Sequence, residues 1–167
     1  SVYWDISITQ WRKLESYVEW MLREFRLSLP CVVYAVHLFG QNLMSKMMKF
    51  RPDRPDHLRR TAVFNMTWDL FYVDHFFKIW TSPKEKSEAI FFTHDRVLKS
   101  VMRLAIAVQR AGNLDPALQY LNQRQAAALR SIIDTRSERT DRVYGTDAWS
   151  PEHRARRIEA IEAALFQ

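Results

Sequence analysis

Apolar side chains recur at three- and four-residue spacing over most of this chain, and only three glycines occur in its 167 residues. Residues at that spacing lie on one face of a helix, so the pattern predicts amphipathic helices. A chain so poor in glycine also disfavours a fold of many short strands and tight turns. Its length and its 47% of hydrophobic residues suit one globular unit. We therefore expect a single domain dominated by helices.

Local signals mark where these helices start and stop. Thr9 and Ser150 are typical N-cap residues, and Gly112 is typical of the position just past a helix. Residues 31–39 are apolar all round, which suits a buried strand or a buried helix, and we favour a helix running to about Lys49. The expected helices cover residues 9–25, 31–49, 61–80, 95–111, 115–135 with a break near 121–124, and 151 to near the C-terminus.

Two segments predict strands. Residues 89–93 (AIFFT) form a compact apolar run without alternation, as expected for a strand buried on both faces. Residues 2–8 (VYWDISI) are β-branched and aromatic, which favours a second short strand or an extended entry. The predicted fold class is therefore α/β and helix-dominated: a small parallel sheet flanked by helices, with a helical C-terminal extension.

The charge balance points to anionic partners. The chain carries a net charge of +6 and its pI is about 9.7, so its surface attracts polyanions such as RNA or DNA. Residues 49–60 (KFRPDRPDHLRR) hold two prolines and five basic residues against two acids, which predicts a basic loop. We expect Arg51, Arg54, Arg59 and Arg60 in this loop to contact a phosphate backbone.

Cysteine and hydropathy restrict the compartment. Cys31 is the only cysteine, so a disulfide within the chain is excluded, which fits a reducing cytoplasm. The longest apolar stretch, residues 29–40, is shorter than the roughly 20 residues that a membrane span needs. We expect a cytoplasmic protein without a membrane partner.

Acidic residues supply the candidate chemistry. Asp69 and Asp74 interrupt an aromatic helix, and five residues correspond to about 140° of helix rotation, so only one should point into a common pocket. Asp95 directly follows the AIFFT run, and Asp5 lies in the other expected strand. Acids from separate segments that meet at strand ends would form an oxygen-ligand site for Mg²⁺ or Mn²⁺. The alternatives are an N-cap role for Asp95, a salt bridge for Asp69 and a surface position for Asp5.

The stretch 65–98 (NMTWDLFYVDHFFKIW…AIFFTHDRVL) resembles the second half of a PIN-like domain. In that family a helix carries one acid, and a following strand ends in a Thr-x-Asp turn that carries another. The resemblance implies that Asp69, Asp95 and Asp5 are the catalytic, metal-holding acids and that Thr93 supports the turn. The bound ion would activate water to cut RNA, since a divalent metal lowers the pKa of its water.

The functional expectation follows from this resemblance. It implies a PIN-like core over residues 1–112, a helical extension over 113–167 within the same unit, and a divalent-metal-dependent endonuclease acting on RNA rather than DNA. Toxins are common members of that family, so a toxin or phage-defence effector is expected, with Asp74 as a supporting acid. The extension could dock a protein partner or a second copy. The alternative is a non-catalytic helical adaptor subunit of a nucleoprotein or defence complex.

Overall fold

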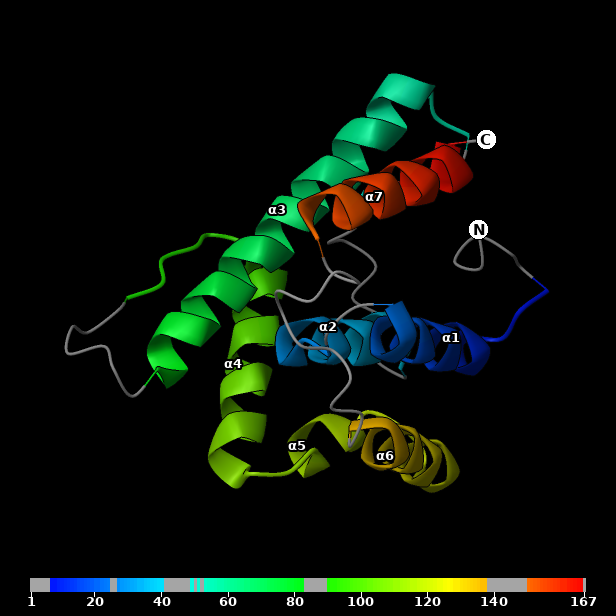
Figure 1. The fold of residues 1–167 in the computed structure, drawn as a ribbon. Coiled ribbons are helices and arrows are strands. Elements are labelled where there is room, and N and C mark those ends of the chain that lie inside the picture. The colour runs from blue at the N-terminus through cyan, green and yellow to red at the C-terminus, as the bar shows by residue number, and fades with distance from the viewer. Residues whose placement is uncertain are drawn as a thin grey trace.

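The computed structural model describes residues 7–24, 27–40, 49, 51, 53–82, 90–137 and 150–166. Within these ranges all regular structure is helical (Figure 1). The helices are α1 (Gln10–Glu24), α2 (Leu29–Phe39), α3 (Asp56–Thr81), α4 (Arg96–Ala111), α5 (Asp115–Leu118), α6 (Gln123–Ser137) and α7 (Pro151–Phe166). The predicted α/β fold with a small parallel sheet is wrong, because the described residues contain no strand.

The apolar run that predicted the central strand lies on the surface. Ile90 is 72% exposed and Phe92 is 88% exposed, whereas Phe91 packs on Phe76 of α3 with the ring centroids 5.4 Å apart. A buried strand needs neighbouring strands to satisfy its backbone, and the described residues offer none. Phe91 therefore anchors an irregular segment to α3. Residues 2–6 of the other expected strand lie outside the described residues.

Helix α2 forms the centre of the molecule, with α1, α3, α4 and α5 packed around it (Figure 1). Val32, Val33 and Val36 are at most 1% exposed, and the helix interpretation of this segment is confirmed. The helix ends at Phe39, well before Lys49. A side chain on Gly40 would come within 3.0 Å of the Tyr120 carbonyl oxygen, so glycine permits this close approach.

The predicted helix boundaries are confirmed where a side chain caps the backbone. The Thr9 hydroxyl accepts the Arg12 N–H at 3.3 Å, and the Ser150 hydroxyl accepts the His153 N–H at 3.2 Å. Gly112 ends α4 with a φ of 65°, a conformation that favours glycine. The expected break after α5 is also present, and Asn122 and Gln125 cap the start of α6 reciprocally.

The longest described helix, α3, is attached to the rest of the molecule along one side. Its 26 residues bury Leu70, Val73 and Phe77, and Met66 accepts a hydrogen bond from Tyr34 of α2 at 3.3 Å. Residues 56–60 form the start of this helix, so the prediction of a loop over residues 49–60 is wrong for residues 56–60. Most of the helix surface therefore lies outside the core. In the described part of the chain, no helix combines the length and the apolar character needed to cross a bilayer.

Candidate functional site

Two of the three predicted acids lie near each other. Asp69 is half-buried on α3, and Asp95 is exposed at the start of α4. Burial raises the pKa of the Asp69 carboxyl, the nearby Asp95 charge raises it further, and Lys49 lowers it. Asp5 lies outside the described residues. The structure thus brings together Asp69 and Asp95, from α3 and the start of α4.

The Asp95 carboxylate serves as an N-cap. Its Oδ1 accepts the backbone N–H of Val97 at 2.7 Å and that of Leu98 at 3.0 Å. The Thr93 hydroxyl accepts the Asp95 N–H at 3.1 Å, so the Thr-x-Asp turn is the start of α4. The alternative role predicted for Asp95 is confirmed. Among the described residues, no group of three or more His, Cys, Asp or Glu side chains is arranged to hold a metal ion.

The second acid of α3 has a structural role. Asp74 is half-buried, accepts a hydrogen bond from the Ser28 hydroxyl at 2.9 Å, and pairs with Lys78 at 2.5 Å. Ser28 stands directly before α2, so this contact ties the C-terminal half of α3 to the start of the central helix. The expected division, with one acid of α3 in a pocket and the other in solvent, is not seen, since Asp69 is half-buried as well.

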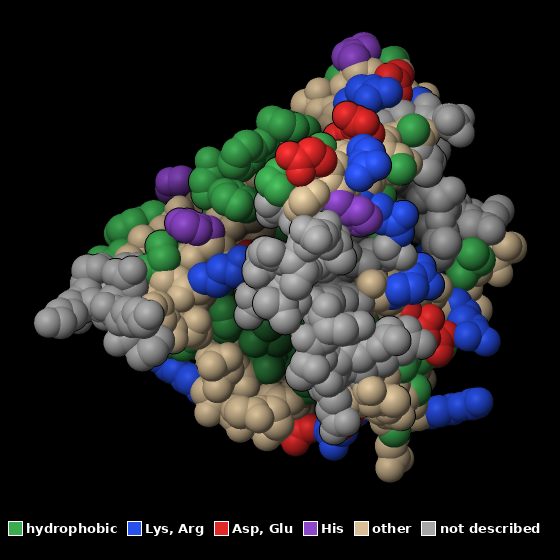
Figure 2. Space-filling view, viewed as in Figure 1, with side chains coloured by type: hydrophobic (Ala, Val, Ile, Leu, Met, Phe, Trp, Pro, Cys, Tyr) green, Lys and Arg blue, Asp and Glu red, His purple; other side chains and the backbone are tan. Residues whose placement is uncertain are grey.

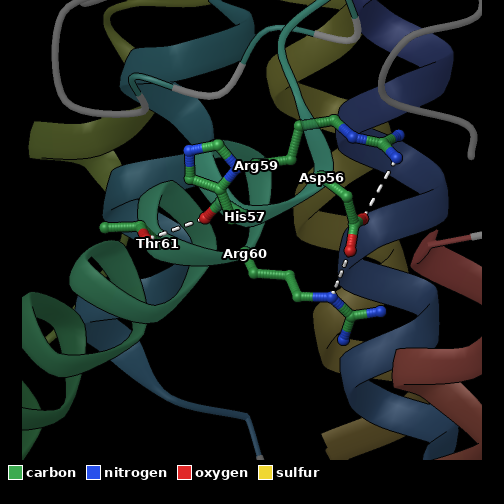
Figure 3. Close-up of polar contacts among 5 residues, drawn as sticks. All are labelled: Asp56, His57, Arg59, Arg60 and Thr61. Atoms are coloured by element: carbon green, nitrogen blue, oxygen red, sulfur yellow. Dashed lines mark hydrogen bonds and ion pairs between the residues drawn. The ribbon is translucent and has the colours of Figure 1, made fainter.

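The predicted nucleic-acid-binding arginines fall into two pairs. Arg59 and Arg60 both bind the Asp56 carboxylate, at 3.1 and 2.7 Å, in the first turn of α3 (Figure 3). The Arg60 hydrogen bond is the main reason that the pKa of Asp56 is lowered. Arg51 and Arg54 are exposed before the helix. Contact of these four residues with a phosphate backbone stays a prediction.

The feature that the sequence interpretation missed is a patch of exposed aromatic side chains on α3. Phe64 is 61% exposed, Trp68 42%, Phe71 53% and Tyr72 56%. We call these four residues the aromatic face. Trp68 lies at its centre, with ring centroids 5.9 Å from Phe64, 5.5 Å from Phe71 and 5.6 Å from Tyr72. Hydrophobic side chains form a band along α3 in the space-filling view (Figure 2).

Phe64 and Phe71 are large apolar residues of the kind that usually pack in a core, yet both are exposed. Helix α3 carries apolar residues all round, but only the side that bears Leu70, Val73 and Phe77 is buried, and α3 packs on α2 and α4. Phe64 and Phe71 lie on another side. Each side had a signal in the sequence, because its apolar residues recur at three- and four-residue spacing. A helix that is buried on one side needs only one such run, so the second run indicates an additional apolar face.

Comparison with known proteins adds no relative: no protein-family model, no curated protein and no solved structure matches this chain. The resemblance to the PIN-like family therefore stays a prediction. The parallel sheet on which that family builds its metal site is the part that the described residues contradict.

Proposed function

We propose that this chain is a non-catalytic helical adaptor, which binds a protein partner through the aromatic face of α3. The observation that carries the proposal is the exposure of Phe64, Trp68, Phe71 and Tyr72 as one group of contacting rings. Contiguous apolar side chains on a surface are characteristic of interaction sites. Aromatic residues are also enriched in the buried centres of protein interfaces.

The way α3 is held supports this proposal. The helix packs on α2 and buries Leu70, Val73 and Phe77 in the core, so the exposed rings are held on a fixed support. Binding at a rigid helix costs less conformational entropy than binding at a loop that must first become ordered. The aromatic face can therefore bind without a change in the fold.

Charge favours a protein over a nucleic acid as the partner. Residues 64–72 (FNMTWDLFY) contain no lysine or arginine, and their only charged residue is Asp69. Surfaces that bind single strands combine stacking aromatics with cations that follow the phosphates. On α3 itself, the cations nearest to this stretch are Arg60 and Lys78, and each pairs with a carboxylate of the same helix. Lys49 acts on Asp69, the half-buried acid of the stretch.

The metal-dependent nuclease predicted from the sequence stays a prediction. Its support weakens because Asp95 is occupied as the cap of α4 and because the strand of the resemblance is absent from residues 90–93. Asp69 and Asp95 remain close enough to influence each other's charge. Two carboxylates alone are a weak basis for a metal site, so the aromatic face leads.

Site-specific crosslinking tests the proposed function. A photoreactive benzoylphenylalanine replaces Phe71 in the cells that naturally produce the chain, and the matched control carries it at Arg103, an exposed position of α4. We expect a covalent adduct with one identifiable polypeptide from position 71, weakened by Trp68→Ala and absent from position 103. Equal labelling from both positions, or an adduct with RNA or DNA, would overturn the proposal.

A further inference from the structure

Exposed positions follow one another along α3 in alternating steps of four and three residues. Such a repeat averages 3.5 residues per turn, which is the period that two packed helices share. All of its members are exposed, and they are His57, Thr61, Phe64, Trp68, Phe71, His75 and Lys78. We call this line the seam. A second helix is the occupant that suits its geometry.

The residues beside the seam repeat every seven positions. They are Leu58, Asn65 and Tyr72 on one side, and Arg60, Thr67 and Asp74 on the other. When two copies of one helix pack antiparallel, each side of the seam meets the same side of the other copy. Such an interface is self-complementary, because the contact between residues i and j occurs twice.

Building on the proposed function, we infer that the partner is a second copy of this chain, with the two α3 helices packed antiparallel about a two-fold axis. We place the two helices in the register in which Trp68 of each copy packs on Phe64 of the other. Phe71 packs on Thr61 and His57 lies opposite His75, whereas Lys78 extends beyond the first residue of the other copy's α3. The largest exposed rings of the aromatic face are then covered.

The side positions match in the same register. Leu58 of one copy faces Tyr72 of the other, which joins two exposed apolar side chains. Arg60 faces Asp74, a pair of opposite charges, and Asn65 faces its own copy. Arg60 and Asp74 already take part in pairs within α3, so the contact between copies extends these pairs. Complementary charges beside an apolar seam select its register and orientation.

A parallel arrangement lacks this complementarity. It would set each seam residue against itself, so Lys78 would face Lys78 across the axis. Arg60 and Asp74 would then lie on different turns, and their opposite charges would not meet. Like charges placed face to face oppose association. The antiparallel register is the one in which Arg60 and Asp74, the charged positions beside the seam, meet.

Sedimentation equilibrium of the full chain tests the inference. We expect a species of twice the 19.9 kDa chain mass, and Trp68→Ala should weaken dimerisation by about 30-fold or more, as for a central aromatic residue of an interface. The matched control is Trp80→Ala, because Trp80 is exposed on α3 but lies off the seam. A monomer at all concentrations, or equal dimerisation by both variants, would overturn the inference.

Crosslinking with a short bis-maleimide tests the register in a Cys31→Ala background. Asn65→Cys should crosslink to its own copy, since position 65 faces itself across the proposed axis. Thr61→Cys should not, because position 61 then faces Phe71. Crosslinking through position 61 and not through 65 would indicate a parallel pair and contradict the antiparallel inference.

The two proposals fail in different ways. If the chain is a monomer but position 71 still crosslinks to another polypeptide, the inference is wrong and the adaptor function stands. If the chain forms a dimer that Trp68→Ala does not weaken, the dimer uses another surface, and the inference is again wrong. If position 71 labels nothing above the Arg103 control, the adaptor function itself fails.

Discussion

Helices α2 and α3 are both rich in apolar residues, yet the molecule uses them differently. In α2 small and β-branched residues such as Val33 and Val36 are surrounded by four other helices. In α3 one side packs on α2, while Phe64, Trp68 and Phe71 remain in solvent. The number of apolar residues therefore does not decide burial here. Burial depends on how many neighbours a helix has, and α3 carries more aromatic surface than its neighbours cover.

The largest effect that this comparison predicts is in the core. Leu38 of α2 is 5% exposed, so Leu38→Ala should lower the free energy of unfolding by about 2–5 kcal/mol through lost burial and a residual cavity. Chemical denaturation measures the change. A loss below about 1 kcal/mol would show that α2 is less enclosed than described.

The next effect concerns His37, which is buried in α2. Its ring packs on the ring of Tyr120, with the two ring centroids 4.8 Å apart. Both of its ring nitrogens lack a hydrogen-bond partner among the described residues, and burial lowers the pKa of His37 from 6.5. The unfolded chain then binds a proton more readily than the folded chain. Stability should fall as the pH drops below 6.5, by at most about 1.4 kcal/mol per pH unit for one proton.

The His37→Leu variant isolates this effect because leucine does not titrate. Thermal melts between pH 7.5 and 5.5 should show a shallower loss of stability in the variant than in the wild type. The same pH dependence in both proteins would show that other groups cause it.

A smaller effect is expected at Asp95. Asp95→Ala should cost about 1 kcal/mol, because two backbone N–H groups of α4 lose their acceptor, whereas Asp95→Asn should cost much less. Denaturation of both variants measures this, alongside nuclease assays with Mg²⁺ or Mn²⁺. Metal-dependent cleavage by the wild type that disappears in Asp95→Asn would contradict a purely structural role and restore the nuclease prediction.

Local features of the fold were predictable from the sequence, and features that depend on distant contacts were not. Asp95 begins α4 and Gly112 ends it, through hydrogen bonds and backbone angles that involve only a few neighbouring residues. Sequence patterns therefore locate both ends of the helix. The run 89–93 has the composition of a buried strand, but a strand also needs partners from elsewhere in the chain. Which side of α3 is buried depends on where α2 lies, so the sequence could not place Phe64 and Phe71 on the surface.

The same distinction holds for the candidate site. The Thr-x-Asp pattern at Thr93 and Asp95 identifies a functional turn and a helix start equally well, because both use the same hydrogen-bonding side chains. Only the contacts of the Asp95 carboxylate with Val97 and Leu98 separate the two. The aromatic face had a sequence signal in its spacing, but that signal is shared with buried helix faces.

The central claim is that the aromatic face serves binding and contributes little to the fold. The most direct test is the free energy of unfolding of Phe64→Ala, measured at concentrations where the chain is monomeric. Phe64 is 61% exposed and its one described ring contact is with Trp68. We predict a change within about 0.5 kcal/mol, as for surface substitutions. A loss of about 3–5 kcal/mol, typical of a core phenylalanine, would contradict the account.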